Sequence, residues 1–239
     1  MDEVELEKSG RPVVAMCALA VMATVNEVVI PDFEQAGSRV EIIWDPTVAL
    51  MKRIVAGQHA DTILAIDWAL DELAADGRII LESRRSIAQA LVGVGVRAGA
   101  HKPDISNEAS LRRTLLEVRS LVYSEAGASG IYFEKLIDRL DIRAAIKAKA
   151  TIIPVGLTGE LVARGDVELA IQQVSELLVV DGVDLVGPMP PGLDATTNFS
   201  AAVFSDATDP AEAEVFLKLM VTPAACQSYK KAGMAPLFT

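Results

Sequence analysis

Short apolar runs alternate with amphipathic segments along most of the chain. Runs such as RVEIIWD, DTILAID and RSLVYS predict buried strands, because their apolar residues are nearly continuous. Segments such as TVALMKRIVA and FEKLIDRLDI follow them, with apolar residues recurring at helical spacing. Strands that alternate with helices of about ten residues predict an α/β fold with mostly parallel sheets.

Two stretches mark places where the chain can cross from one lobe to another. The first is the glycine-bearing stretch Leu91–Gly99 (LVGVGVRAG), and the second is Gly187–Val203. A lobe inserted into another lobe needs two crossings, and hinges are a few extended residues that absorb changes in φ and ψ. The length of 239 residues, 51% of them hydrophobic, allows one large domain or two lobes of roughly 100 residues each.

The composition argues against several classes of partner. A net charge of −11 argues against binding to nucleic acid or to an anionic membrane surface. The cysteines, Cys17 and Cys226, and the histidines, His59 and His101, lack the spacing of a metal site. We expect two free thiols, although a disulfide between the cysteines stays open, and we expect neither a metal nor a cofactor.

The apolar stretch Val13–Val25 resembles the hydrophobic region of a signal peptide, but we interpret it as the first buried strand. Acidic residues precede it, no polar cleavage region follows it, and the pattern continues into a helix. It is also short for a membrane span. We therefore expect no secretion leader in the chain as given.

The stretch Tyr123–Leu136 (YSEAGASGIYFEKL) joins an apolar strand to an amphipathic helix through small residues. Such a loop exposes N–H groups at a helix N-terminus, where proteins bind anions. It lacks the GxxxxGK[ST] pattern of a nucleotide-binding loop. It therefore predicts either an anion site with Ser124 and Ser129 as donors, or a turn in which Ser129 only caps a helix starting near Ile131.

The order of several segments along the chain resembles that of a known protein family. They are IPDFE, RVEIIWD, LVGVGVRAG, GASGIYF, QQVSEL and a final helix–TP–helix pattern, TDPAEAEVFLKLMVTPAACQSYKKAGMAP. This order resembles the type 2 periplasmic solute-binding proteins, in the branch that contains molybdate-binding proteins. The resemblance extends from about Val13 to Pro236.

The resemblance implies a two-lobed Venus-flytrap fold, in which each lobe is a mixed, mostly parallel sheet flanked by helices. It places residues 1–91 and 197–239 in lobe 1 and residues 92–196 in lobe 2, with hinge crossings near 91–97 and 187–203. It also implies a monomer in the periplasm that captures a small anionic solute between its lobes. The solute would then pass to the permease of an ABC transporter.

The ligand positions of that branch match this chain only in part. The first oxyanion-binding serine of the branch falls at Val21, which has no side-chain donor. The second falls at Thr47, and a ligand-binding tyrosine falls at Gln173. An amide both donates and accepts, which suits a carboxylate with a hydroxyl better than a bare metal oxyanion. We expect a small carboxylate or an oxyanion other than molybdate.

We expect the ligand to contact residues in three segments: Thr47, Ser124, Gly127, Ser129, Gly130, Gln172 and Gln173. Neighbouring residues on a strand point to opposite faces, so only one of the two glutamines should face the cleft, and we favour Gln173. The alternatives are that Thr47 caps the helix 47–56 and that both glutamines are exposed at the strand end.

Two other functions stay open. Aconitate isomerase resembles this branch too, so an isomerase of a small unsaturated carboxylate would use the same cleft. Glu125 is then either its base or only a solvated carboxylate of the loop. A cytoplasmic ligand sensor is the other alternative, since no leader is visible. The arginines Arg85, Arg97 and Arg164 match no ligand position of the family, so we do not expect them to clamp a carboxylate.

Overall fold

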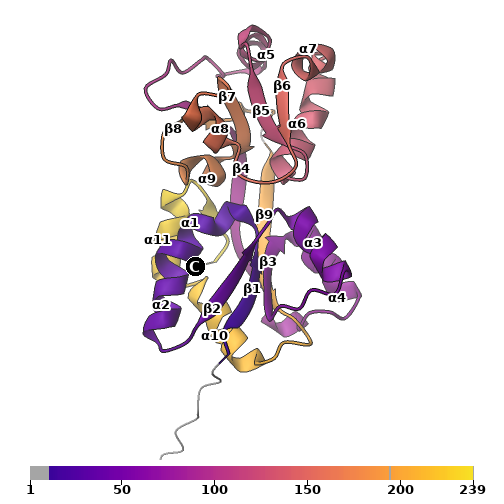
Figure 1. The fold of residues 1–239 in the computed structure, drawn as a ribbon, viewed down its shortest axis with the longest axis vertical. Coiled ribbons are helices and arrows are strands. Elements are labelled where there is room, and N and C mark those ends of the chain that lie inside the picture. Colours follow the sequence, from indigo (N-terminus) through magenta and orange to yellow (C-terminus); the bar gives the residue numbers. More distant parts are fainter. Residues whose placement is uncertain (1–10, 194, 239) are drawn as a thin grey trace, which may run out of the picture.

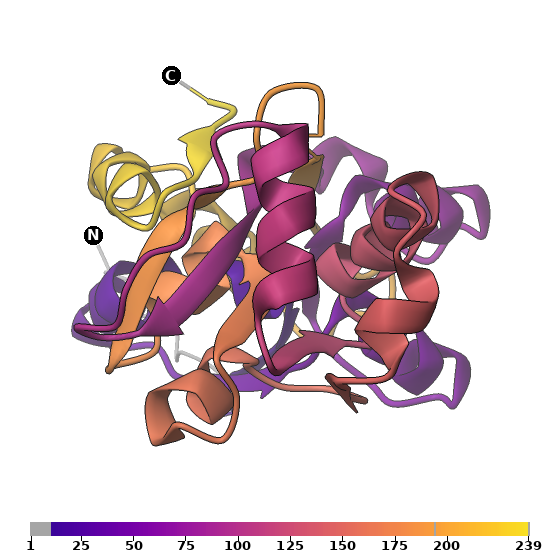
Figure 2. The same ribbon diagram turned by 90° about the horizontal axis from the view of Figure 1, so that it is seen from above.

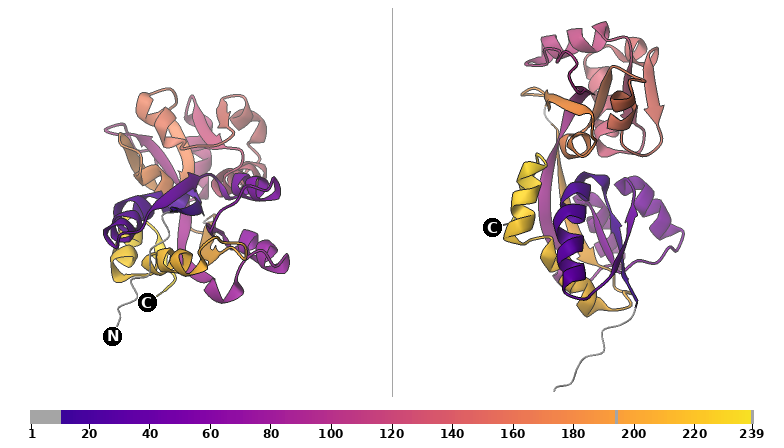
Figure 3. Two further views of the ribbon diagram at one scale, coloured as in Figure 1. Left: turned by 60° about the horizontal axis from the view of Figure 1, so that its bottom comes forward. Right: turned by 60° about the vertical axis from the view of Figure 1, so that its left-hand side comes forward.

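The computed structural model describes residues 11–193 and 195–238 and consists of two α/β lobes joined on one side by extended strands (Figures 1 and 3). We call the part built on β1, β2 and β3 the first lobe and the part built on β5, β6 and β7 the second lobe. The predicted two-lobed α/β fold, with mixed and mostly parallel sheets flanked by helices, is confirmed. The predicted lobe boundaries stay a prediction.

In the first lobe, β1 lies between β2 and β3 and runs parallel to both, while β9 pairs antiparallel with β3. Its strands are β1 (Val13–Cys17), β2 (Val40–Trp44), β3 (Thr62–Ile66), β9 (Thr196–Val203) and β10 (Ala235–Pro236). Its helical segments are η1 (Leu19–Val21), α1 (Met22–Thr24), η2 (Val25–Val29), α2 (Ile30–Gln35), α3 (Thr47–Val55), α4 (Asp67–Ala75), η3 (Leu81–Ser83), α10 (Pro210–Leu219) and α11 (Pro223–Lys231).

The second lobe repeats this plan, with β5 lying between the parallel strands β6 and β7. Its strands are β5 (Leu121–Ser124), β6 (Ala150–Ile153), β7 (Leu169–Gln173) and β8 (Val183–Pro188). Its helices are α5 (Glu108–Glu117), α6 (Ala128–Arg139), α7 (Arg143–Lys147), α8 (Gly159–Arg164) and α9 (Val174–Leu178). Seen from above, α5 lies across the top of this lobe (Figure 2).

One long strand, β4 (Arg85–Arg97), belongs to both sheets. Residues 85–91 pair with β9, and residues 92–97 pair with β7 and β8. Two glycines in its second half let α9 approach closely. A Cβ on Gly93 would lie 2.8 Å from the Val174 side chain, and a Cβ on Gly95 would lie 3.0 Å from the Leu177 side chain. Larger residues at these positions would therefore push α9 away from the strand.

Each lobe has its own apolar core. Phe33 and Phe216 pack edge to face in the first lobe with ring centroids 5.2 Å apart. Tyr123 and Phe133 do the same in the second lobe at 5.1 Å. The amphipathic helices that the sequence predicts cover these cores, so each lobe buries apolar surface of its own.

The predicted helix near residues 23–36 is less regular than its pattern indicates. A π-helical segment, η2, separates α1 from α2 and ends immediately before the helix that contains Pro31. Proline has no N–H to donate to the carbonyl four residues earlier, which favours a local widening of the helix at this point.

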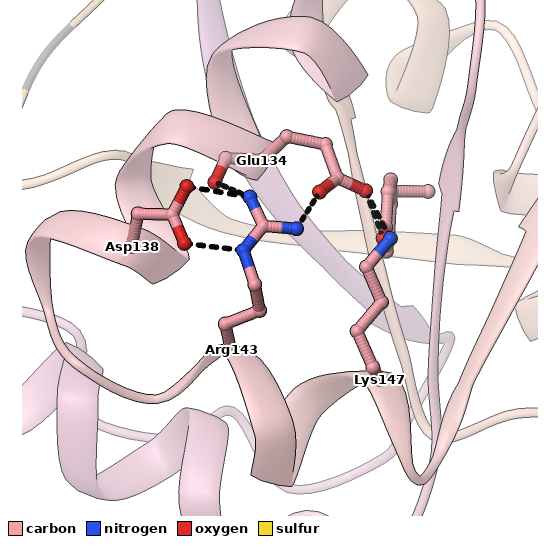
Figure 4. Close-up of polar contacts among 5 residues, drawn as sticks. Glu134, Asp138, Arg143 and Lys147 are labelled. Carbon is pink, nitrogen blue, oxygen red and sulfur yellow. Dashed lines mark hydrogen bonds and ion pairs between the residues drawn. The ribbon is translucent and has the colours of Figure 1, made fainter.

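A charged network ties α6 to α7 on the second lobe (Figure 4). Arg143 pairs with Glu134 and with Asp138, both at 2.6 Å, and Glu134 also pairs with Lys147 and accepts from the Tyr123 hydroxyl. Burial raises the pKa of Glu134, but hydrogen bonds from Lys147, Tyr123 and Arg143 outweigh this and leave the pKa below its ordinary value. Hydrogen bonding to Arg143 likewise lowers the pKa of Asp138.

Carboxyl groups with depressed pKa values stabilise the folded state above their unfolded pKa values, and this contribution is lost as the pH falls. We therefore expect Arg143→Met to lower the melting temperature by a few degrees at pH 7, with the gap to wild type narrowing towards pH 3. Thermal melts at pH 7, 5, 4 and 3 would measure this. Arg164→Met, which removes an exposed ion pair with Asp166, is the control and should stay closer to wild type at neutral pH. A constant gap for Arg143→Met across the series would contradict the expected role of the network.

Candidate functional site

Two adjoining cavities lie between the lobes. The outer cavity has a volume of about 530 Å³, and the inner one holds only about 20 Å³, close to the room that one water molecule needs. Both are lined by Thr47 and Ile66 from the first lobe and by Ala128 from the second. A solute larger than water therefore fits the outer cavity, and reaches the inner one only if the lobes part.

The N-termini of three helices line the outer cavity. Thr47 begins α3, Asp67 begins α4, and Ala128 begins α6. The first turns of helices carry N–H groups without intrahelical partners and a partial positive charge, which favours an anion by about 0.3–1 kcal/mol per helix. Asp67 opposes this field, but it accepts from the Ser200 hydroxyl and lies 3.8 Å from Arg84.

Apolar side chains form the rest of the outer cavity. Trp68 of α4 is 40% exposed and Ile131 of α6 is 42% exposed, so the two lobes present these side chains towards the same space. Among the described residues that line this cavity, Lys135 is the one cation. The site can therefore accept an anion that has a carbon skeleton.

The inner cavity brings together most of the residues that the sequence predicts. Its lining comprises Ala18, Leu19, Pro46, Thr47, Ile66, Ser124, Gly127, Ala128, Gly156, Gln172, Gln173, Glu176 and Phe199. The loop after β1 contributes only the apolar residues Ala18 and Leu19, whereas Val21 is buried in the core of the first lobe. None of these three residues has a side-chain donor, which agrees with the expectation for Val21.

The alternative interpretation, in which Thr47 caps α3, is wrong. The N-cap residue is Pro46, and Thr47 is the first residue of the helix, without a side-chain capping bond. Its hydroxyl oxygen accepts a hydrogen bond from the Ile66 N–H at 3.3 Å, which links the starts of α3 and α4. The hydroxyl proton stays able to donate to a ligand.

The loop after β5 separates into residues that line the cavity and residues that pack. Ser124 and Gly127 line the inner cavity, whereas Ser129 and Gly130 line neither cavity and are completely buried in α6 or nearly so. A Cβ on Gly130 would lie 1.6 Å from the Ser124 carbonyl oxygen, so this glycine lets α6 start directly against β5. Its placement fits close packing rather than ligand contact.

Ser129 is not the helix cap that the sequence suggested as an alternative. The helix begins three residues earlier than expected, at Ala128, because Gly127 serves as its N-cap residue. Ser129 therefore lies in the first turn. Its buried hydroxyl is among the side-chain groups without a hydrogen-bond partner in the described part of the chain.

Both glutamines line the inner cavity, which corrects the expectation that only one of them faces it. The strict alternation of a strand ends here, because β7 stops at Gln173 and α9 begins at the next residue. Gln172 is fully engaged: its oxygen accepts from the Thr158 N–H and hydroxyl, both at 2.7 Å, and its amide donates to the Gly156 carbonyl at 3.0 Å. It orders the neighbouring loop.

Gln173 has capacity left for a ligand. Its Nε2 group donates to the Thr197 hydroxyl at 3.1 Å, while its buried Oε1 has no partner among the described residues. A hydroxyl both donates and accepts, so Thr197 can pair with either end of the amide. Gln173 can therefore turn either an acceptor or a donor towards the cavity.

Sequence reasoning missed Glu176, which also lines the inner cavity. Desolvation raises its pKa from the ordinary value to about 7, although hydrogen bonds from the Gln173 backbone and the Gln172 side chain act in the opposite direction. Glu176 is the third residue of α9 and Gln173 is the N-cap residue, which is the spacing at which a glutamate satisfies the N-cap N–H. The spacing of Gln173 and Glu176 in QQVSEL was the sequence feature that could have pointed to Glu176.

The other charged candidates lie elsewhere. Glu125 is exposed and lines neither cavity, and Arg85 pairs with Glu214. Arg97 lines a separate pocket of the second lobe, and Arg164 pairs with Asp166. Within residues 11–193 and 195–238, no group of His, Cys, Asp and Glu side chains could hold a metal ion. No helix in the same part of the chain has the length and apolarity to span a membrane.

The chain belongs to the family of bacterial extracellular solute-binding proteins, whose model matches residues 13–235. The predicted membership of the solute-binding proteins is thus confirmed, and the predicted fold is the one that molybdate- and sulfate-binding proteins share.

Individual relatives are similar to this chain, in sequence or in structure, over nearly its whole length. An aconitate isomerase from a Pseudomonas species is 33% identical, over 96% of this chain and 90% of that protein. The periplasmic molybdate-binding protein of Azotobacter vinelandii superposes with a TM-score of 0.76 at 18% identity, over 93% of this chain and 98% of that one. The sulfate-binding protein SubI of Mycobacterium tuberculosis gives 0.74 at 17% identity, over 95% and 88%. At these identities the two structures show a shared fold.

The packing of α6 on β5 predicts a large effect of a single methyl group. We expect Gly130→Ala to lower the melting temperature by at least about 6 °C, because an overpacked core costs about 3 kcal/mol or more here. Gly187→Ala is the control, since its Cβ would meet nothing closer than Ile105 at 3.7 Å. Differential scanning calorimetry of both variants measures the effect. A Gly130→Ala variant as stable as wild type would show that the helix can shift without cost.

Proposed function

We propose that this protein binds a small organic carboxylate in the cleft between its lobes and supplies it to an ABC-type importer. The observation that carries the proposal is the composition of the cleft. Three helix N-termini and the hydroxyls of Thr47 and Ser124 provide donors, while Trp68 and Ile131 provide apolar walls. Donors suit a carboxylate, and the apolar walls suit its carbon skeleton.

A bare metal oxyanion fits this cleft less well. It presents oxygen atoms in every direction and gains nothing from apolar walls, whereas the loop after β1 offers only Ala18 and Leu19. The 33% identity with a protein named aconitate isomerase also favours a carboxylate over molybdate. The names of the structural neighbours support an anionic ligand in general.

The family supports the transport role. Its members are described as extracellular solute-binding proteins, and one structural neighbour is described as periplasmic. The proposal accordingly has this protein acting in the periplasm and presenting its solute to a permease, and we further propose that it acts as a monomer. Binding favours closure only if the closed state has the higher affinity, since equal affinity for both states shifts no equilibrium.

We expect a di- or tricarboxylate to stabilise the protein more than molybdate, tungstate or sulfate. At a hundredfold excess over Kd, binding to the native state contributes about 2.7 kcal/mol, which corresponds to a rise of about 5 °C or more in melting temperature. A thermal-shift screen with trans-aconitate, citrate, malate and the three oxyanions measures this. Larger shifts with molybdate or tungstate would contradict the carboxylate assignment.

The Ser124→Ala variant tests the position of the ligand. We expect its affinity for the best carboxylate to fall roughly tenfold or more, because a hydrogen bond to a charged group contributes about 1.5–3 kcal/mol. Ser205→Ala removes a hydroxyl that donates to Gly77 outside the cleft and should leave the affinity unchanged. Isothermal titration calorimetry compares the two. Equal affinities for both variants and wild type would exclude the inner cavity as the site.

A second candidate function is the isomerisation of a small unsaturated carboxylate, favoured by the relative named aconitate isomerase and by Glu176 in the cavity wall. A carboxylate base would take a proton from the methylene carbon beside one carboxylate and return it to the far carbon of the allylic system. The double bond then moves without loss or gain of atoms. A base with a pKa of about 7 suits this transfer near neutral pH.

This candidate predicts turnover of cis-aconitate to trans-aconitate, with deuterium entering the product in D₂O. Glu176→Gln should lower the rate by about 100-fold or more, because it removes the proton carrier. Proton NMR follows both the product and the exchange. Binding of aconitate without isomerisation or exchange by the wild type would exclude the isomerase and leave the solute-binding function in place.

A further inference from the structure

Helix α9, which carries Glu176, contacts both lobes. It belongs to the second lobe, where it packs against β4, β7 and β8, and it also packs against η1 of the first lobe. A second contact to the first lobe lies at the turn after α11, where a Cβ on Gly233 would be 2.7 Å from the Val174 side chain. The helix that carries Glu176 is therefore held between segments of both lobes.

Glu176 is the one ionisable group among the described residues that line the inner cavity. The remaining polar side chains there are hydroxyls and amides, namely those of Thr47, Ser124, Gln172 and Gln173. A carboxylate in such a place has no cation to compensate it. Gln173, which is 2% exposed, also leaves a buried oxygen without a partner at the same wall.

The elements packed against α9 bring no compensating charge into this cavity. Neither β7 nor η1 contains an ionisable residue. Of the charged residues on β4, Arg85 lies at one end and pairs with Glu214, and Arg97 lies at the other end beside a separate pocket. On β8, Asp184 accepts from the Gly99 N–H.

The first lobe is equally neutral at the inner cavity. Lys230 and Lys231 end α11 near the Gly233 turn, but neither residue lines the cavity. In the loop before α3, Asp45 is paired with Arg53 at 2.6 Å. Glu125, in the loop before α6, is exposed. An anionic ligand would therefore meet Glu176 without an intervening cation.

We propose that Glu176 becomes a carboxylic acid when a ligand carboxylate binds, so that this protein takes up one proton together with its solute. The proposal rests on the carboxylate-binding function proposed above. Where the ligand carboxylate comes within hydrogen-bonding distance of Glu176, repulsion between like charges disfavours ionisation of both groups, whereas one proton shared between them forms a hydrogen bond. The acid form of Glu176 also supplies an O–H donor beside Gln173, whose buried Oε1 has no partner among the described residues.

Proton uptake has a defined consequence for affinity. Free Glu176 is mostly ionised at pH 8, since its pKa of about 7 lies below that pH, whereas the bound form stays protonated. The affinity should therefore fall with rising pH above about 7, approaching tenfold per pH unit. Below pH 6 Glu176 is protonated before binding, and the affinity should no longer depend on its ionisation.

The test counts protons during binding. Isothermal titration calorimetry with trans-aconitate at pH 8, in phosphate and in Tris, separates the heat of buffer ionisation from the heat of binding. We expect an uptake approaching one proton per trans-aconitate for the wild type and none for Glu176→Gln, whose affinity should be the same at pH 6.5 and pH 8. Glu125→Gln removes the same charge from the neighbouring exposed loop and should retain the uptake.

The outcomes separate this proposal from the proposed function. Tight binding by the wild type without proton uptake, or uptake that persists in Glu176→Gln, overturns the proposal and leaves the solute-binding function intact. Failure of the wild type to bind trans-aconitate or any other acid of the screen overturns both. A wild type that takes up no proton overturns the proposal even if Glu176→Gln folds poorly. The isomerase candidate needs an ionised Glu176 in the complex, so full uptake also counts against it.

Discussion

The sharing of β4 between the two sheets is the constraint on which the rest of the structure depends. Because its first half pairs with β9 and its second half with β7 and β8, one strand sets how the two sheets lie relative to each other. The carboxyl ends of the parallel strands of each lobe then face the same space, where α3, α4 and α6 begin. Gly93 and Gly95 let α9 lie against this strand, which brings Gln173 and Glu176 to the inner wall of the cleft.

Some polar side chains of the cleft hold its loops and helices in position, and others can bind a ligand. Gln172 uses its side chain to hold the loop at Gly156 and Thr158 and to donate to Glu176, and Thr47 links α3 to the N-terminus of α4. Ser124 and Gln173 keep capacity for a ligand, because they lie at the ends of strands where the backbone turns into a helix. An acidic protein can in this way hold an anion through local dipoles while its overall field repels it.

Much of the fold was predictable from the chain, and the reasons are local. Continuous apolar runs predicted the strands, and helical spacing predicted the helices that cover them. The expectation that RVEIIWD is buried was wrong, because β2 lies at the edge of the sheet and is only partly buried. The predictions failed where contacts with residues distant in the sequence determine the local structure. A π-helical segment ends shortly before Pro31, and Gly127 starts α6 earlier than its periodicity indicates. Gln172 and Gln173 line the same cavity because β7 ends at Gln173 and α9 begins at the next residue.

The sequence by itself determined the family, the order of strands and helices, and the segments that meet at the cleft, because these follow from periodicity and from the spacing of recognisable segments. Only the tertiary structure decided which polar groups have partners. Ser129 and Gly130 resemble ligand-binding residues in the chain but pack inside α6, whereas Glu176 resembles a helix-capping residue yet lines the cavity. Burial and the absence of a nearby cation set the ionisation of such a group, and both depend on segments that are distant in the sequence.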